Sequence, residues 1–478
     1  MENLSNLDLY FAEIIIFLGS LVCIVFGAFF KKGSFKKVSL LSFITLFASL
    51  LFILFSNNSH ENSNNFYGNS SFTNVAKLFI IILSMGILYV STNYIKNNNL
   101  DLFEYPVLLL FAVLGMLLMI SANDFLLLYI SIELQSLSLY VLVALNRDSL
   151  KSSEAALKYF ILGSIASAII LYGISITYSI TGSTNYSIIK NFSFTENSVL
   201  LFSFGLILIL SGLAFKLSAA PFHMWTPDVY EGSPSSVTTI LITIPKVAVL
   251  AAIIKVLREP FLYLQELWQQ IVIILIILSM LIGSVSALRQ ENIKRLFAYG
   301  TIANIGYVLI GIISNSSQGL SASILYLVIY TIASLGVFSF IMMLRKESSQ
   351  IVNLNGLAGF SQPNPVASIC MVMLLLSMAG IPPFAGFFAK FYIFVSAIES
   401  GFLFIAIIGV IFSVISSFYY LKIIKIMYMD DDNETHSFDI DKKMYTMLLI
   451  TSLAMLLFIF FANDFIEYVN NLNVQNLL

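Results

Sequence analysis

The sequence predicts an all-α polytopic membrane protein with about fourteen transmembrane helices. Of its 478 residues, 59% are hydrophobic and 10% are charged. The mean hydropathy of +0.92 is far above that of a soluble protein of this length. Long apolar runs recur along the whole chain, and about 20 apolar residues are enough to cross the hydrocarbon core as a helix. No hydrophilic stretch is long enough for a soluble domain, so residues 1–478 are expected to form one membrane domain.

A helix is expected wherever an apolar run of span length lies between polar or charged stretches. The first three helices fall within residues 1–104. In chain order, the expected spans are 8–30, 37–56, 74–95, 105–121, 123–145, 156–181, 197–219, 236–257, 267–288, 297–314, 319–344, 365–397, 402–428 and 443–467.

The distribution of basic residues predicts the orientation, because basic loops stay on the cytoplasmic side. One set of alternate loops carries 17 of the 24 lysines and arginines, the other loops carry four, and three lysines lie within spans. This alternation agrees with an even number of helices and predicts that both termini lie on the outer face. The loop 57–73, which has no Lys or Arg, then lies outside as well.

Redox cofactors and metals are not expected on this chain. Cys23 and Cys370 both fall in apolar spans far apart in sequence, where buried thiols are expected rather than a disulfide or a metal site. There is no glycine-rich nucleotide-binding loop. A haem or metal site is not expected from the three widely separated histidines, which are His60, His223 and His436.

Two spans are interrupted by proline in a related way. In the seventh span, Lys216 is followed by Ser-Ala-Ala-Pro-Phe at 218–222, and in the twelfth, Gly-Ile-Pro-Pro-Phe-Ala-Gly at 380–386 precedes Lys390. Proline removes a backbone donor and clashes with the preceding turn, so both helices are expected to break and free carbonyl groups at membrane depth. Such backbone is tolerated only where protein buries it or where it lines water.

The two breaks lie five helices apart, and an odd offset reverses the direction in which a block of helices crosses the membrane. We therefore expect two inverted five-helix repeats, helices 4–8 over residues 105–257 and helices 9–13 over residues 267–428, with Lys216 and Lys390 as counterparts. Helix 14 and a tail follow at 443–478. Ordinary proline kinks in transmembrane helices are the alternative.

Three lysines and one glutamate lie deep within the predicted spans. An ammonium group at bilayer depth is costly, which favours a functional role for Lys216, Lys246 and Lys390. Glu133 is the only carboxylate far from a span end, and it would stay ionised if it faced an ammonium, so Lys216 is its expected partner. The alternative is a permanent structural salt bridge, but buried ion pairs seldom add net stability over apolar packing.

Lysine is suited to proton transfer because burial shifts its proton affinity, which arginine cannot match. Lys246 follows Pro245, so a kink and a desolvated amine coincide in the eighth span. Snorkelling of the side chain to the membrane surface fits Lys77, Lys255 and Lys158 better than the three deep lysines.

Between Lys246 and Lys390, the tenth and eleventh spans offer hydroxyl and amide groups but no acid or amine at depth. A proton route there would need hydroxyls and trapped water, whereas ordinary helix packing is the alternative role for these side chains. The polar residues are Tyr299, Thr301, Asn304, Tyr307, Tyr326, Tyr330 and Thr331.

Four sequence blocks are highly specific: residues 215–234, with Trp-Thr-Pro-Asp-Val-Tyr at 225–230, and residues 245–247, 289–299 and 380–391. They resemble subunit N of the bacterial respiratory NADH:quinone oxidoreductase (complex I), within the antiporter-like, Mrp-related family of membrane subunits. Three features favour the N type over its relatives L and M. The chain stops soon after the fourteenth span, Lys390 stands where subunit M is expected to carry Glu, and residue 226 is Thr where the relatives are expected to have Leu.

The resemblance implies that Glu133 and Lys216 are the paired charges of a first proton half-channel. It implies that Lys246 is a central relay and that Lys390 exchanges protons with the outer face. Asn304 departs from the histidine of some family members, which puts a protonatable relay in the tenth span in doubt. The further relay candidates are Lys158, His223, Tyr299, Asn304 and Tyr330.

The activity that the resemblance implies is proton translocation in a bacterial inner membrane, driven by redox chemistry in other subunits. FMN and iron–sulfur clusters are expected on those partner subunits, with no cofactor on this chain. Expected partners are neighbouring antiporter-like and small membrane subunits and the lipid bilayer, with quinone as a substrate of the whole complex and no nucleic acid. The alternatives are a subunit of an Mrp-type cation/proton antiporter or membrane-bound hydrogenase, and a non-transporting assembly scaffold.

Overall fold

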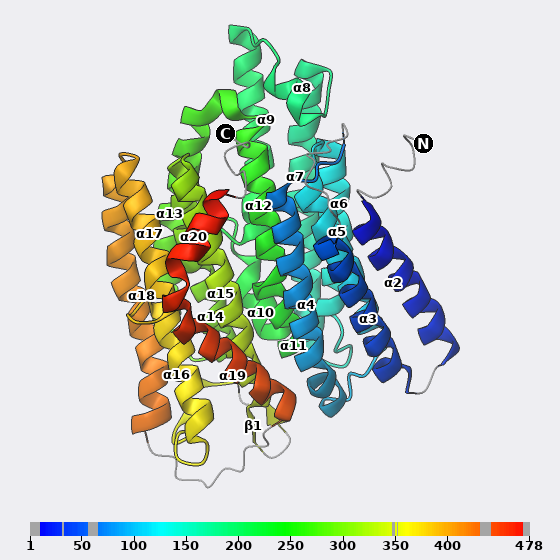
Figure 1. Ribbon diagram of the computed structural model, residues 1–478, viewed down its shortest axis with the longest axis vertical. Coiled ribbons are helices and arrows are strands. Elements are labelled where there is room, and N and C mark those ends of the chain that lie inside the picture. The colour runs from blue at the N-terminus through cyan, green and yellow to red at the C-terminus, as the bar shows by residue number, and fades with distance from the viewer. Residues whose placement is uncertain are drawn as a thin grey trace. The chain divides into compact units, whose positions relative to one another are not determined.

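The computed structural model describes residues 10–30, 33–55, 66–346, 349–350, 352–430 and 441–471. Within them, thirteen helices are long and apolar enough to cross a membrane. They coincide with thirteen of the predicted spans, and the remaining span, 365–397, forms two shorter helices, so the all-α membrane class is confirmed (Figure 1). His60, His436 and the tail 472–478 lie outside the described residues.

The chain divides into two compact units, which we call unit 1 and unit 2. Unit 1 is drawn from the chain up to Leu217 and from Ile244–Trp268. Its helices are α2 (Phe11–Phe29), α3 (Ser34–Phe55), α4 (Ser71–Asn97), α5 (Glu104–Ser121), α6 (Phe125–Val143), α7 (Leu150–Thr181), α8 (Tyr186–Lys190), α9 (Glu196–Leu217) and α12 (Ile244–Arg258), with the short η2 (Leu262–Leu264).

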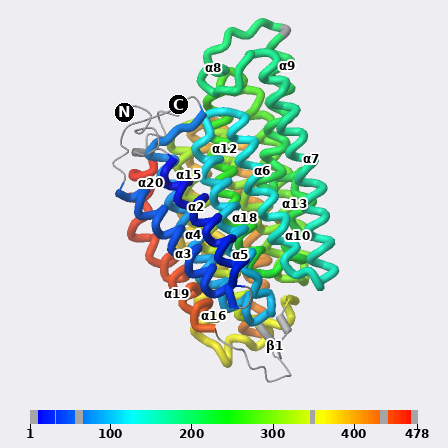
Figure 2. Tube along the Cα trace, turned by 90° about the vertical axis from the view of Figure 1, so that its right-hand side faces the viewer, coloured from blue at the N-terminus to red at the C-terminus, as the bar shows by residue number. Residues whose placement is uncertain are grey.

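In unit 1, long helices pack in pairs, and α12 is fully buried. Helix α2 packs against α3, α5 against α6, and α7 against α9, which lie side by side in Figure 2. Every residue of α12 is buried, and this helix packs against α4, α5 and α9. Because the charged residues Lys246, Lys255 and Arg258 of α12 would be costly against lipid, this helix belongs in the protein interior.

Unit 2 is drawn from Ser218–Thr243 and from Gln269 onwards. Its centre is α15, which packs against α11, α14, α16, α17 and α19. Its elements are α10 (Trp225–Gly232), α11 (Ser235–Ile242), most of α13 (Gln265–Leu288), α14 (Ile293–Ile313), α15 (Ser317–Met343), β1 (Arg345–Lys346), β2 (Ser349–Gln350), η3 (Leu354–Leu357), α16 (Pro365–Ala379), α17 (Ala385–Glu399), α18 (Leu403–Met429), α19 (Lys442–Leu457), η4 (Phe458–Phe460) and α20 (Ala462–Asn471).

Both predicted helix breaks are present. Helix α9 ends at Leu217, Ser218 takes a left-handed φ of 69°, and the chain becomes helical again only at Trp225. Helix α16 ends at Ala379, where Gly380 has a φ of 83°, and α17 begins five residues later. The eighth span is also divided, because α11 and α12 are separated at Thr243, just before the proline that predicted a kink.

Two lysines lie in the interior rather than at the membrane surface. Lys77 and Lys255 are only 2% and 3% exposed, so the prediction that they snorkel is wrong. The physical reason is that each has polar partners inside unit 1: Glu13 for Lys77 and Asn123 for Lys255. The prediction that Cys23 and Cys370 are buried is confirmed.

A close backbone approach between α5 and α6 depends on Gly115. A Cβ atom there would lie 2.7 Å from the Gln135 backbone nitrogen and 2.8 Å from the Ser131 carbonyl oxygen. Small residues allow membrane helices to approach in this way, since lipid supplies no hydrophobic force between them.

We therefore predict that Gly115→Ala lowers the free energy of unfolding by about 1–3 kcal/mol, because α5 and α6 must separate. Thermal unfolding of the purified protein in detergent would measure this. Gly300→Ala is the matched control, since its Cβ would meet nothing closer than 3.4 Å. Equal stability of the two variants would contradict the prediction.

Candidate functional site

Lys216 lies in the last turn of α9 and is 5% exposed. Its Nζ donates hydrogen bonds to Ser136 Oγ at 2.7 Å and to Tyr140 OH at 3.3 Å, both on α6. The ammonium also lies 5.7 Å from the centre of the Tyr140 ring, within the range of a cation–π interaction. Neutral oxygens and an aromatic ring therefore surround this amine.

Glu133 does not form the predicted ion pair with Lys216 among the described residues. Its Oε1 is buried without a hydrogen-bond partner, although the carboxylate interacts electrostatically with both Lys216 and Tyr140. The reason lies in the helical period, because Glu133, Ser136 and Tyr140 share one face of α6 at spacings of three and four residues. The hydroxyls of Ser136 and Tyr140 accept hydrogen bonds from the Lys216 amine, whereas the Glu133 carboxylate interacts with it without a hydrogen bond.

Lys246 lies at the start of α12 and is 1% exposed. Its Nζ donates to the Leu217 carbonyl at 3.0 Å and to the Lys216 carbonyl at 3.3 Å. These carbonyls are at the C-terminus of α9, where a helix has no N–H groups to satisfy them and where its dipole favours a cation. The break therefore provides the binding site for the second amine.

Lys390 on α17 is 4% exposed and is held in a related way. Its Nζ donates to the Ala379 carbonyl at the end of α16, at 2.8 Å, and to Ser413 Oγ on α18, at 2.9 Å. The ammonium also lies 4.9 Å from the centre of the Tyr307 ring. Its environment thus resembles that of Lys246, which also binds a carbonyl freed by a break, more than that of Lys216.

Gly380 makes room for Lys390. Its φ of 83° is rarely adopted by other residues, and a Cβ atom would lie 2.7 Å from Lys390 Cδ. A glycine at this position therefore allows both the left-handed end of α16 and the passage of the lysine side chain.

In unit 2, the tenth and eleventh predicted spans form a connected polar network. Tyr326 OH donates to Asn304 Oδ1 at 2.6 Å, and Asn304 Nδ2 donates to Tyr420 OH at 3.3 Å. One turn away, Tyr330 OH donates to Thr301 Oγ1 at 2.8 Å. The sequence predicted hydroxyl groups at this depth but not their connection to α18.

A small cavity adjoins this network and has room for about one water molecule. Its polar lining comes from Asn304, Tyr326, Tyr330 and Ser377. Ser377 lies in the last turn of α16 and accepts a hydrogen bond from the Gly386 backbone N–H across the break. The cavity therefore extends from the tyrosine network to the broken helix that carries the Lys390 binding site.

The other relay candidates are not part of these groups. Lys158 is 44% exposed and pairs with Glu154, one turn away on α7, at 2.8 Å. Tyr299 is only partly buried, and the hydrogen bonds described above for Asn304 do not involve it. His223 lies between α9 and α10, where burial lowers the pKa of its imidazole and leaves Nδ1 without a hydrogen-bond partner.

One ion cluster was missed from the sequence. Arg295 Nη1 lies 2.7 Å from Asp228 Oδ1 and 3.2 Å from Glu231 Oε2, so α14 holds α10, the helix that follows the first break. The only signal was the i, i+3 spacing of the two acids. Over the part of the chain that the structure describes, no group of three or more His, Cys, Asp or Glu residues could hold a metal ion.

Comparison with known proteins shows the family of this chain. Residues 122–416 match the family model described as NADH:quinone oxidoreductase/Mrp antiporter, TM. A relative from Pelagibacter ubique, named NADH-quinone oxidoreductase subunit N, is 41% identical over 98% of this chain and 100% of its own length.

Solved structures share the fold. A chain of respiratory complex I from Thermus thermophilus aligns with a TM-score of 0.81 and 27% identity, covering 95% of this chain and 98% of its own. A chain of the Mrp complex from Dietzia sp. aligns with a TM-score of 0.86 over 99% of both chains, but its 18% identity supports the fold alone. This chain belongs to the NADH:quinone oxidoreductase/Mrp antiporter membrane family, among the relatives named subunit N of NADH-quinone oxidoreductase.

Proposed function

We propose that this chain translocates protons as the N subunit of an NADH:quinone oxidoreductase, using Glu133, Lys216, Lys246 and Lys390. The observation that supports this most is the seating of Lys246 and Lys390 on carbonyl groups freed by helix breaks. A carbonyl accepts a hydrogen bond from either an ammonium or a neutral amine. These sites therefore suit a group that gains and loses a proton, whereas a carboxylate partner would hold the charge permanently.

Proton transfer in unit 1 would depend on the distance between Glu133 and Lys216. The carboxylate favours the charged form of Lys216 without being bonded to it, so a small movement of α6 would change how strongly the lysine holds its proton. Lys246 Nζ donates a hydrogen bond to the backbone carbonyl of Lys216, so the Lys246 amine is held at the helix end that carries Lys216. A proton released by Lys216 would pass to Lys246 and then toward Lys390.

Within unit 2, the route would use hydroxyls and water. Asn304 has no protonation equilibrium near neutral pH, so it would orient Tyr326 and Tyr420 rather than carry the proton. The water-sized cavity beside Ser377 would supply the mobile link toward Lys390. Tyr330 lines the same cavity and donates a hydrogen bond to Thr301.

The rest of the complex would supply the driving force. FMN and iron–sulfur clusters would be bound by partner subunits, where NADH is oxidised and quinone reduced. Neighbouring membrane subunits would act on α6 and on the exposed pair Glu154 and Lys158. The protein would span a bacterial inner membrane with both termini on the periplasmic side.

We also propose that residues 105–257 and 267–428 are inverted repeats. Each contains a broken helix whose first half ends in carbonyl groups bound by a lysine, Lys246 in one and Lys390 in the other. The feature common to the two repeats would then be the helix break with its bound lysine, and Lys246 rather than Lys216 would be the counterpart of Lys390.

The second candidate is a subunit of an Mrp-type cation/proton antiporter, which the fold shared with the Dietzia chain favours. It would use the same lysines but exchange protons for a metal cation without redox chemistry. Exchange of Na⁺ for protons in vesicles, independent of NADH, distinguishes it from the first proposal.

We predict that mildly solubilised membranes run on a native gel will show this chain in a large band that stains for NADH dehydrogenase activity. The expectation follows from its assignment to the complex rather than to a free transporter. Detection of the chain by antibody, beside the activity stain, is the measurement. Migration only in a band without this activity would favour the antiporter.

We predict that Lys216→Ala and Lys216→Arg both lose more than half of NADH-driven proton pumping while the complex still assembles. Alanine removes the proton carrier, and arginine keeps the charge but does not release its proton. Acidification of inside-out vesicles at matched NADH oxidation measures pumping. Lys425→Ala, at a side chain 63% exposed, is the control. Full pumping by both Lys216 variants would favour a scaffold role.

We predict that Gly380→Ala impairs pumping more than Gly401→Ala does. Both glycines have similar positive φ angles, 83° and 86°, so both substitutions carry the same backbone strain of about 1–2 kcal/mol. Only at Gly380 would the new Cβ displace the Lys390 side chain, since nothing lies within 4 Å at Gly401. Equal pumping by the two variants, at equal amounts of assembled complex, would show that the position of Lys390 is not critical.

A further inference from the structure

A second group of buried titratable residues lies in unit 1, away from Lys216. Glu13 is in the first turn of α2, Lys77 is on α4, and Tyr67 precedes α4, with exposures of 3%, 2% and 0%. Lys77 Nζ lies 2.9 Å from Glu13 Oε1, Tyr67 OH donates to the same oxygen at 2.8 Å, and Lys77 Nζ donates to Tyr67 OH at 2.6 Å. We call these three residues the Glu13 triad.

The triad can redistribute protons internally. Burial, together with the Glu13 carboxylate, raises the pKa of the Tyr67 hydroxyl, so the phenol stays protonated and acts as a donor. If Tyr67 gives its proton to Glu13 and receives one from Lys77, an ammonium and carboxylate become an amine and carboxylic acid with no change in proton number. Glu13 Oε2 is buried and has no hydrogen-bond partner, which leaves one oxygen free to accept a further proton.

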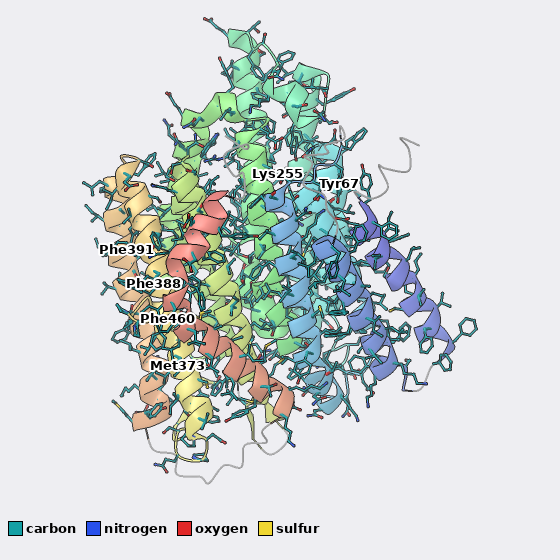
Figure 3. All side chains as sticks on the ribbon, in the orientation of Figure 1. Tyr67, Lys255, Met373, Phe388, Phe391 and Phe460 are labelled. Atoms are coloured by element: carbon teal, nitrogen blue, oxygen red, sulfur yellow. The ribbon has the colours of Figure 1, made fainter. Side chains whose placement is uncertain are left out.

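Backbone and side-chain hydrogen bonds link the segment that carries Tyr67 to α12. The Gly68 N–H donates to the Ser121 carbonyl at 2.8 Å and the Asn123 N–H to the Phe66 carbonyl at 2.9 Å, so the segment around Tyr67 is paired with the turn between α5 and α6. Asn123 Oδ1 then accepts a hydrogen bond of 2.6 Å from Lys255 Nζ. Figure 3 shows Tyr67 and Lys255 at the same end of unit 1.

The triad also acts electrostatically on α12. Lys77 interacts with Lys255 as a like charge, and Glu259 interacts with it as an opposite charge. Lys255 lies nine residues after Lys246, about 14 Å along the same helix. The titratable groups that interact with the triad are Tyr10, whose ring centre is 4.3 Å from that of Tyr67, and Lys255. Arg258 and Glu259 follow Lys255 at the end of α12.

We propose that the Glu13 triad is a second protonatable site whose charge state acts on Lys246 through Asn123, Lys255 and α12. Protonation of Glu13 removes the carboxylate charge that is paired with Lys77, so the repulsion between Lys77 and Lys255 is then offset only on the Lys255 side, by Glu259. This repulsion favours a shift of Lys255 or the loss of one of the two protons, and a buried helix transmits such a shift along its length. The triad residues are positioning residues, and the inference rests on the proton translocation proposed above.

The test uses the whole complex in membrane vesicles and measures protons pumped per NADH oxidised across the pH range around neutrality. The variants are Glu13→Gln, Tyr67→Phe and the neutral double variant Glu13→Gln/Lys77→Met, which removes both charges and so avoids an unpaired buried ion. Asp430→Asn is the matched control, because Asp430 is 41% exposed and its pair with Lys425 is a surface contact. Assembly is followed on native gels.

We expect the double variant to assemble and to oxidise NADH normally. It should lose more than half of the protons pumped per NADH, and the pH dependence of its pumping should differ from that of the wild type. Full pumping with an unchanged pH profile in the assembled double variant would overturn the inference and leave the triad as a packing element. Lys216→Ala in the same membranes separates the two proposals. If the Lys216→Ala variant also pumps fully, the proposal that this chain translocates protons is contradicted. If Lys216→Ala loses pumping while the double variant pumps fully, only the proposed role of the triad is contradicted.

Discussion

The arrangement of this protein depends on the mutual satisfaction of two groups that a lipid bilayer does not tolerate alone. A broken helix leaves carbonyl groups without N–H donors, and a lysine brings a charged ammonium group. At the end of α9 the freed carbonyls bind Lys246, and at the end of α16 a freed carbonyl binds Lys390. The hydrogen bond between a freed carbonyl and a lysine amine lowers the cost of burying both groups, so the helix breaks and the lysines depend on each other. The packing of α12 and α15 at the centres of their units keeps both sites away from lipid.

The sequence predicted the helices and the breaks well because these features are local. Apolar run length fixes the spans, and proline with glycine fixes where α9 and α16 end. The side-chain partners were less predictable, since they depend on which of several polar residues on one helix face is nearest. Glu133 was an obvious partner for Lys216 on charge alone, yet Ser136 and Tyr140 are the residues bonded to it.

Distance along the chain accounts for the other differences from expectation. Snorkelling to the membrane surface was predicted for Lys77, whereas in the structure it pairs with Glu13, which is 64 residues away in sequence. The Asn304 network has a similar origin, because Tyr420 lies 116 residues from Asn304. Long-range pairs of this kind follow from tertiary packing, and neither hydropathy nor residue spacing in a single sequence specifies them.

The contact between Lys246 and the main chain at position 216 has a consequence for how such a site changes over evolution. A hydrogen bond to a peptide carbonyl does not depend on the side chain that residue carries. Mutation at position 216 can therefore alter the first amine while the seat of the second is inherited unchanged. The two amines can in this way change independently, although the second is held by the helix end that carries the first.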